Sequence, residues 1–325
     1  MPTRRDSLVF LPASFLAGFL VARPAFAVGK VRSLEVRILS TMLTADDGIG
    51  EWGFSALVVA DGHRILVDTG AYPDTVLRNC RELKIDLSDV PDVILTHNHN
   101  DHTGGFLPLR NEYAKVNPAA LSRAHVASGI FLTRVRNDGR EINRMAGIKR
   151  EYEATGAVVK EYSELKELFP GVWLTGPVPR KYPERNWSGT GRLRTAEGKI
   201  VEDNIPEDQS LVIDTDRGLV VITGCGHAGI VNICEYSRSA IRNAPTYAIL
   251  GGIHLYEASD ETLAWTGAKL KEFGLQNLLG AHCTGIEAVY RLRASTGLAR
   301  KTAAVGAVGG GFTLANGLDP GSISR

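Results

Sequence analysis

The sequence predicts an α/β fold in which two packed β-sheets form one domain and helices cover the outer face of each sheet. Hairpin patterns at 55–67 and 210–222 each open one half of the chain, and strand and helix patterns alternate after each hairpin. A single doubly wound sheet is the alternative. The two hairpins count against it, because such a sheet is built from strands joined by helical crossovers.

The individual elements are predicted from hydrophobic periodicity and turn residues. Alternation over 33–40 predicts a half-exposed edge strand, and 161–168 is predicted to be a short helix. The same criteria predict further helices at 73–83, 229–239 and 260–273, and further strands at 55–60, 64–67, 92–95, 172–175, 210–213, 219–222, 246–250 and 278–279.

Residues 1–27 are predicted to be a twin-arginine export signal that is separate from the fold. Arg4 and Arg5 precede an apolar run at 8–22, and Ala-Phe-Ala at 25–27 forms a cleavage site of small residues. A membrane anchor is the alternative, but the run of 15 residues is interrupted by proline and glycine and is short for a membrane span. We therefore expect a periplasmic or secreted protein without a stable membrane anchor.

The composition excludes several classes of partner. The chain of 325 residues has a formal net charge of only +1, so it has no basic excess to hold nucleic acid or an anionic membrane. Residues 28–325 are enough for one domain with a large core. The four cysteines are too few for a disulfide framework in a chain of this length. A small-molecule substrate is the expected partner, and no oligomeric state is predicted.

The stretch 96–105 carries the densest set of metal-ligating residue types. His97, His99, Asp101 and His102 follow an apolar strand, and three of the eight histidines of the chain lie here. Alternation at a strand end points His97 and His99 the same way, and the turn that follows can aim Asp101 and His102 at a second point. This arrangement predicts two adjacent metal positions. Imidazole and carboxylate suit zinc, and also iron or manganese.

Three later strands also end in ligand-type residues. His227, His254 and His282 each follow a predicted buried strand and a glycine. One strand-end histidine would be unremarkable, but three of them together with the 97–102 cluster predict one shared site. That site is expected at one edge of the sandwich, where strands from both halves end.

The segment 177–208 is predicted to be a long loop next to this site. It is rich in proline, glycine and charged residues, and loops of this length are commonly lids or binding loops. Arg180, Arg185 and Trp187 are candidates to hold an anionic or flat substrate. A solvated loop without a binding role is the alternative.

The pattern His97-x-His99-x-Asp101-His102 resembles the signature of the metallo-β-lactamase superfamily, whose fold is a four-layer αβ/βα sandwich. Asp68, His227 and His282 agree with that pattern in their order along the chain. The resemblance spans about residues 34 to 315. It is narrower for one subgroup, the 7,8-dihydropterin-6-yl-methyl-4-(β-D-ribofuranosyl)aminobenzene 5′-phosphate synthase-like proteins, through the motifs at 52–55, 101–105, 174–180, 224–229, 251–255 and 282–285.

The resemblance implies two divalent metal ions. His97, His99 and His227 would hold one, and Asp101, His102 and His282 the other. Asp68 would act from behind, orienting a metal-binding histidine or its loop. A strand-end aspartate that satisfies turn amides is the alternative role of Asp68. His254 has no counterpart in the general pattern, so we expect it to contact the substrate or the transition state.

Cys225 stands where the superfamily often has a carboxylate that bridges both metals. A cysteine ligand is chemically credible there, because thiolate binds zinc. The bridge is therefore Cys225, a water alone, or absent, and Cys225 is either a ligand or a packing residue behind His227.

Together these features predict a binuclear metallo-hydrolase that uses a metal-activated water, with Asp101 also holding the nucleophile. The expected substrate is a phosphoester or a related small-molecule ester. Lactone or thioester hydrolysis and a synthase-like transfer reaction are alternatives. A redox di-iron protein and a non-catalytic binding protein of the same fold are rivals of other classes. The intact set of ligands argues against the non-catalytic protein.

Overall fold

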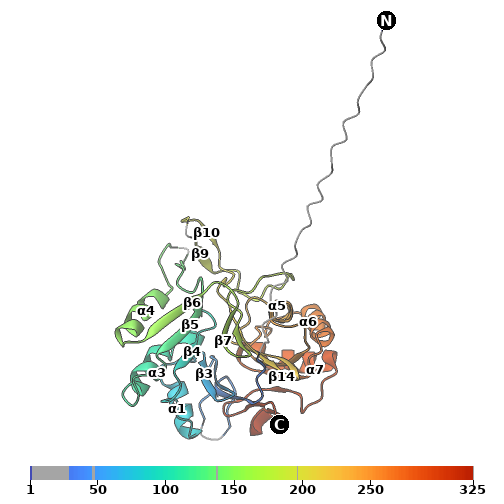
Figure 1. Cartoon of the computed structure of the whole chain (residues 1–325), viewed down its shortest axis with the longest axis horizontal. Helices are drawn as coiled ribbons and strands as arrows, with labels where there is room; N and C mark the ends of the chain where they lie inside the picture. Colours follow the sequence, from blue (N-terminus) through green and yellow to red (C-terminus); the bar gives the residue numbers. More distant parts are fainter. Residues whose placement is uncertain (2–28, 46–47, 137, 196, 325) are drawn as a thin grey trace.

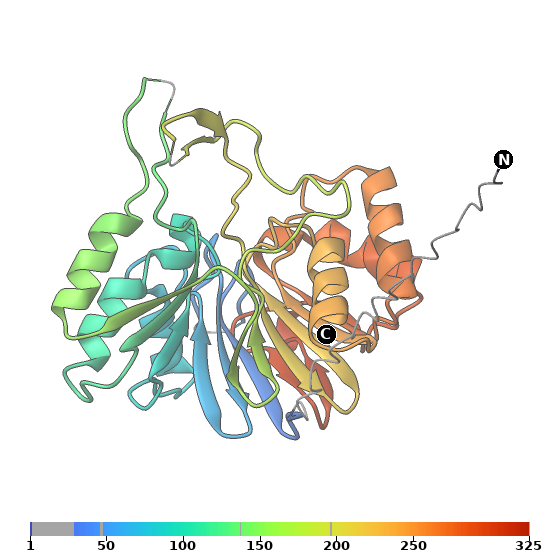
Figure 2. The same cartoon turned by 45° about the horizontal axis from the view of Figure 1, so that its top comes forward.

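The computed structural model describes residue 1 and residues 29–45, 48–136, 138–195 and 197–324. Two β-sheets pack face to face, and helices cover both outer faces, so the described chain forms four layers (Figures 1 and 2). The predicted αβ/βα sandwich is confirmed, and the single doubly wound sheet is excluded. The predicted export signal lies outside the described residues.

The first sheet has eight strands in the order β17-β16-β1-β2-β3-β4-β5-β6. Neighbouring strands from β17 through β16, β1 and β2 to β3 pair antiparallel, and neighbouring strands from β3 through β4 and β5 to β6 pair parallel. The strands β3, β4 and β5 therefore end at the same edge of the sheet. The strands are β1 (Leu34–Ser40), β2 (Ser55–Ala60), β3 (His63–Val67), β4 (Asp92–Ile94), β5 (Arg123–Ala127), β6 (Val158–Tyr162), β16 (Gly311–Thr313) and β17 (Gly317–Asp319).

The second sheet has seven strands in the order β15-β14-β13-β12-β11-β8-β7. Its parallel part, β12 to β15, is buried on both faces, which explains the continuous apolar runs in these strands. The strands are β7 (Lys166–Phe169), β8 (Val172–Leu174), β11 (Leu211–Thr215), β12 (Gly218–Thr223), β13 (Thr246–Gly251), β14 (Asn277–Gly280) and β15 (Ala303–Val305).

Three buried apolar clusters hold the layers together. One lies between the sheets and includes Ile38, Val67 and Leu250. The second packs the second sheet against α5 (Ile230–Ala240), α6 (Asp260–Glu272) and α7 (Ile286–Thr296). The third packs the first sheet against α1 (Thr75–Glu82), α3 (Phe106–Tyr113) and α4 (Met145–Ala154). Burial of this apolar surface is the main term that favours the sandwich.

Two predicted elements differ from the structure. The strand expected at the edge, β1, is interior, because β2 and β16 pair with its two sides. The helix expected at 161–168 is instead the end of β6 and the start of β7. These strands pair with β5 and β8, so non-local pairing overrides the local helix propensity of this segment.

The loop 177–208 is largely irregular, as expected, but it contains a short hairpin of β9 (Arg192–Arg194) and β10 (Ile200–Glu202). Figure 2 shows this hairpin above the upper edge of the sandwich, next to the segment that follows β5. Arg134 in that segment ion-pairs with Asp203 and Glu207, at 2.8 and 2.5 Å, and so anchors the end of the loop. Among the described residues no helix has the length and apolar character needed to cross a bilayer.

Candidate metal centre

The ends of five strands from both sheets deliver the candidate residues to one place. Asp68 follows β3, the 96–102 segment follows β4, and the second sheet contributes residues after β12, β13 and β14. His99 begins the short helix α2 (Asn100–Thr103) as its N-cap, and the 3-10 turn η1 (His282–Thr284) carries His282. Because the strands on each side of the site run parallel, their carboxyl ends meet at one edge, as the sequence predicts.

The structure brings together the two triads that the resemblance implies. Ligand atoms of His97, His99 and His227 lie within 4.8 Å of one another, and so do those of Asp101, His102 and His282. The rings of His97 and His102, which belong to different triads, have centroids 4.2 Å apart, so the triads are adjacent.

Asp68 connects the two triads through hydrogen bonds to Thr96, which contacts His97, and to His102. Its carboxylate accepts hydrogen bonds from the Thr96 amide at 2.8 Å, from the Thr96 hydroxyl at 2.7 Å and from His102 Nδ1 at 2.7 Å. Since the single hydroxyl proton of Thr96 goes to Asp68, the Thr96 oxygen accepts from His97 Nδ1 at 3.0 Å. In neutral His97 and His102 the free lone pair is therefore on Nε2.

His227 is oriented in the same way, because its Nδ1 donates to the backbone carbonyl of Asn186 in the long loop. Nε2 of His97 and Nε2 of His227 are buried and have no hydrogen-bond partner among the described residues. A buried unpaired acceptor is costly. These two nitrogens belong to the same triad, and a cation held there would satisfy both, so the residues fit a metal ion.

Burial also sets the protonation of the first triad. Desolvation lowers the pKa of His97 and of His227 well below the ordinary imidazole value, and neighbouring imidazoles lower it further. Desolvation lowers the pKa of His99 to about 4. All three imidazoles are therefore neutral at pH 7, and neutral imidazole is the form that binds a metal.

The second triad differs because it contains a carboxylate. Burial would raise the pKa of Asp101, but His102 and His282 outweigh it and hold that pKa below its ordinary value. Asp101 Oδ2 lies 3.3 Å from His282 Nε2 and 3.8 Å from His102 Nε2. Burial would lower the pKa of His102, yet Asp68 and Asp101 raise it to about 9, so a cation would displace a proton there.

Two thiols lie beside the triads. Cys225 Sγ is 3.1 Å from His102 Nε2, and its ligand atom also lies within 4.8 Å of those of His97 and His102. This position is compatible with the predicted ligand role of Cys225. The structure adds Cys283, whose Sγ lies 3.2 Å from Cys225 Sγ and which the sequence reasoning leaves unassigned. The sequence does contain a signal for the position of both thiols: each cysteine comes within three residues of a glycine at the end of a predicted strand, Gly224 for Cys225 and Gly280 for Cys283.

The backbone approaches closely and is strained around the centre. A Cβ on Gly224 would lie 2.2 Å from Thr96 Oγ1 and 2.4 Å from Asp68 Oδ2, so only glycine fits behind the triads. Asp68, His254 and His282 have φ values of 54°, 49° and 46° in the left-handed region. Such conformations persist only where the surrounding structure enforces them, and they gather at functional sites.

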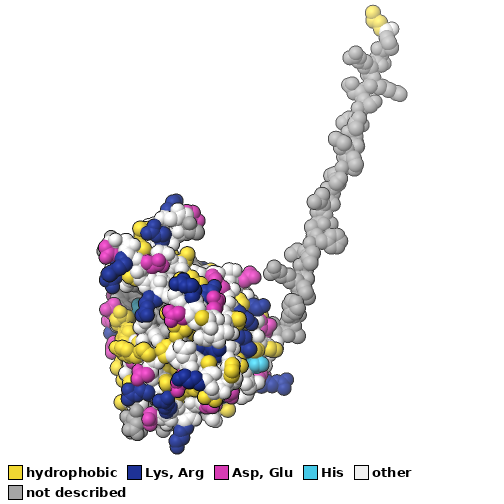
Figure 3. Space-filling model, turned by 90° about the vertical axis from the view of Figure 1, so that its left-hand side faces the viewer, with side chains coloured by type: hydrophobic (Ala, Val, Ile, Leu, Met, Phe, Trp, Pro, Cys, Tyr) yellow, Lys and Arg dark blue, Asp and Glu magenta, His cyan; other side chains and the backbone are white. Residues whose placement is uncertain are grey.

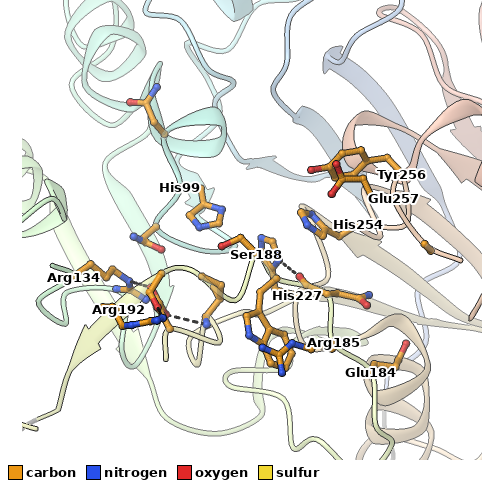
Figure 4. Close-up of a pocket in the computed structure, with 18 of the residues that line it drawn as sticks. His99, Arg134, Glu184, Arg185, Ser188, Arg192, His227, His254, Tyr256 and Glu257 are labelled. Carbon is orange, nitrogen blue, oxygen red and sulfur yellow. Dashed lines mark hydrogen bonds and ion pairs between the residues drawn. The ribbon is translucent and has the colours of Figure 1, made fainter. Parts of the chain in front are cut away.

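A pocket of about 950 Å³ opens beside the first triad and is lined by His99, His227 and His254 (Figure 4). The long loop forms one wall of the pocket, and Ser188 and Arg185 lie on that wall. Tyr256 and Glu257 lie on the opposite side. His254, which follows β13 and is predicted to contact the substrate, is thus part of the pocket lining and faces the space where a substrate would bind.

The three substrate candidates in the loop have different positions, and Arg185 and Trp187 line the pocket. The guanidinium groups of Arg180 and Arg185 both lie over the Trp187 ring, 4.8 and 5.4 Å from its centroid. Arg180 does not line the pocket. Its guanidinium donates to the backbone carbonyls of His227, Asn204 and Ile205, so it positions the loop instead of contacting a substrate as predicted.

Comparison with known proteins shows what this chain is similar to. A model of the metallo-β-lactamase superfamily matches residues 53–139, which contain Asp68 and the 97–102 cluster. The chain is 28% identical to the 7,8-dihydropterin-6-methyl-4-(β-D-ribofuranosyl)-aminobenzene-5′-phosphate synthase of Methanocaldococcus jannaschii, over 80% of this chain and 91% of that protein. It is 29% identical to an uncharacterized protein of the same organism, over 74% of this chain and 86% of the relative.

Solved structures agree with these matches. A metal-dependent hydrolase of the β-lactamase superfamily is 27% identical with a TM-score of 0.64, and the alignment covers 81% of this chain and 93% of the hydrolase. The metallo-β-lactamase fold protein YhfI of Bacillus subtilis, at 14% identity and a TM-score of 0.50, shares the fold over 81% of this chain and 92% of its own. The chain is therefore similar to proteins of the metallo-β-lactamase superfamily over most of its length, and it has their fold.

Proposed function

We propose that the protein is a metal-dependent hydrolase that acts on a phosphoester or a related small-molecule ester. The observation that carries this proposal is the pair of adjacent triads beside a pocket of about 950 Å³. The ligands are imidazole, carboxylate and thiol, a set that suits zinc, with iron or manganese as alternatives. Two divalent cations would lower the pKa of a water toward about 7 and polarise the oxygen under attack.

The residues of the chain supply the remaining functions. Asp101, held ionised between two imidazoles, accepts a hydrogen bond from the attacking water and fixes its direction. His254 contacts the substrate from the pocket wall. Asp68 and the Asn186 carbonyl keep the ligand imidazoles oriented, so little reorganisation is needed when the reaction starts.

Aromatic and cationic side chains in the pocket lining suit an anionic substrate with a flat part, and Glu184, Asp203, Glu257 and Glu261 line the pocket as well. Trp187, Tyr256 and Trp265 provide aromatic surface, and Arg144 and Arg192 provide positive charge. Arg144 is exposed at the N-terminal end of α4. Guanidinium groups bind phosphate oxygens well, so a phosphorylated substrate matches this lining better than a neutral lactone does.

A synthase-like transfer reaction is the second candidate. The observation that favours it is the same combination of arginines and aromatic walls, which also suits a pterin ring and a phosphorylated aminobenzene. The name of the synthase at 28% identity contains these same chemical groups. Both candidates use the same metal centre and differ in whether water or a second substrate attacks.

The test is a substrate screen with metal content measured on the same samples. Phosphomonoesters, phosphodiesters, lactones, thioesters and β-lactams are offered to the zinc-loaded protein and to protein treated with a chelator. We expect chelator-sensitive hydrolysis of a phosphoester that zinc restores. Metal binding without hydrolysis of any class would favour the transfer reaction or a non-catalytic protein, and absence of metal binding would refute both enzymatic candidates.

We also propose that residues 1–27 direct export by the twin-arginine pathway, so that the mature protein is periplasmic or secreted. The support is the arginine pair before a short apolar run, as in export signals of this class. Replacing Arg4 and Arg5 by lysine should trap the protein in the cytoplasm. An unchanged periplasmic yield would exclude this route.

A small molecule is the proposed partner, and nucleic acid is not. On the face seen in Figure 3, acidic and basic side chains are interspersed, without a broad basic patch of the kind that binds nucleic acid. Together with the formal net charge of +1, this arrangement supports a small-molecule substrate.

A further inference from the structure

Cys225, Cys283 and His254 form a cluster that belongs to neither triad. The three residues follow β12, β14 and β13, and their ligand atoms lie within 4.8 Å of one another. The two sulfur atoms are 3.2 Å apart, and both cysteines are buried. A free pair of thiols so close together beside an imidazole is a ligand set in its own right.

We propose that this cluster is a third metal position, rich in thiolate, that takes a thiophilic divalent cation such as Zn²⁺ or Cd²⁺. The proposal does not depend on the hydrolytic reaction, because it concerns which ions the chain binds.

The local backbone supports the assignment. His254 Nδ1 is buried and has no hydrogen-bond partner among the described residues. The residue is held at a φ of 49°, so the fold maintains a strained conformation at this imidazole. A Cβ on Gly252 would lie 2.9 Å from Cys283 Sγ and 2.1 Å from the Gly224 carbonyl, so glycine leaves the space that this thiol occupies.

The charges also balance. Each thiol loses its proton when it binds a metal, so two protons are released and two thiolates neutralise one dication. The third cation therefore adds no net charge beside the two triads. Cys225 Sγ lies 3.1 Å from His102 Nε2, which allows one thiolate to bridge the third position and the second triad.

The site is accessible from the pocket. His254 lines the pocket, so a cation held by this cluster would lie at the pocket wall (Figure 4). A zinc ion with three protein ligands and one open position is typical of sites that bind water or substrate. The sulfur ligands favour zinc or cadmium over magnesium or calcium, which prefer oxygen.

The experiment is a titration of the full-length protein with Cd²⁺ under a reductant, read by ultraviolet sulfur-to-cadmium charge-transfer absorption and by bound cadmium per chain. Cys283→Ser should bind about one Cd²⁺ fewer than the wild type and lose about half of the absorption or more. Cys80→Ser is the matched control, because Cys80 is a buried free cysteine in the helix-covered core of the first sheet. It should titrate like the wild type.

His254→Ala is the second variant, since His254 is only partly buried and its loss is tolerated more easily by the fold. This variant keeps both thiols. Its cadmium affinity, read from the charge-transfer absorption, should fall at least about tenfold. Equal stoichiometry and absorption in wild type and Cys283→Ser would overturn the proposal, as would a Cys225–Cys283 disulfide that persists under reductant. His99→Ala distinguishes the third metal position from the two triads of the proposed function, because this variant should lose a triad cation and retain the thiolate absorption.

Discussion

Replacing Asp68 by asparagine tests whether the carboxylate behind the triads controls metal affinity. Asparagine keeps the shape of the side chain and tolerates the φ of 54° at this position. The carboxylate accepts three hydrogen bonds, two from Thr96 and one from His102. A side-chain amide has only one acceptor oxygen. Whichever way the amide lies, its NH₂ group meets at least one donor, and His102 loses its charged partner.

Loss of a hydrogen-bond partner behind a ligating histidine lowers metal affinity by about 10- to 100-fold. We therefore expect the zinc dissociation constant of Asp68→Asn to rise by that factor, equal to about 1.4–2.7 kcal/mol. Competition with a chromophoric chelator measures it. Asp92→Asn is the matched control, because Asp92 is also buried and bonds a histidine, His125, at 2.7 Å, at the other end of β4. Equal zinc affinity in both variants would refute the reasoning.

Three further predictions follow from the same geometry. His99→Ala should lower bound zinc and abolish hydrolysis, whereas the exposed His63→Ala should change neither; full metal content in purified His99→Ala would show that the ligand assignment is wrong. Gly224→Ala should weaken zinc binding because its Cβ meets two buried side chains within 2.4 Å, whereas Gly147→Ala, whose nearest atom would be 3.9 Å away, should not. Burial would raise the pKa of Asp92, but its bonds to His125 and Arg123 lower it to about 2. Asp92 therefore stabilises the fold by about 2 kcal/mol above pH 4, and this contribution is lost as the pH falls toward 2, which acid unfolding of Asp92→Asn against the wild type measures.

The parts of the site that could be predicted are those that a strand end encodes locally. A buried apolar run that is soon followed by histidine indicates where a strand stops, and it does so at His97, His227, His254 and His282. The order of these motifs carries the family resemblance, and with it the division into two triads. Neither inference needs long-range contacts.

The parts that could not be predicted depend on pairings between distant segments. Residues 161–168 favour a helix locally, yet they are strands because β5 and β8 lie beside them. The direction of Arg180 depends on how the loop folds over His227. The contact between Cys225 and Cys283 spans 58 residues and has no local signal.

The register of the second sheet explains why residues so far apart in sequence meet. Thr223, Gly251 and Gly280 are paired across β12, β13 and β14, so the segments that follow them leave the sheet at one level. A one-residue slip of β14 would turn its side chains to the opposite face and withdraw His282 from its triad. The buried residues of these strands, such as Leu250 and Leu279, prevent that slip, because it would move them out of the core between the sheets. The metal centre therefore depends on core packing as much as on its ligands.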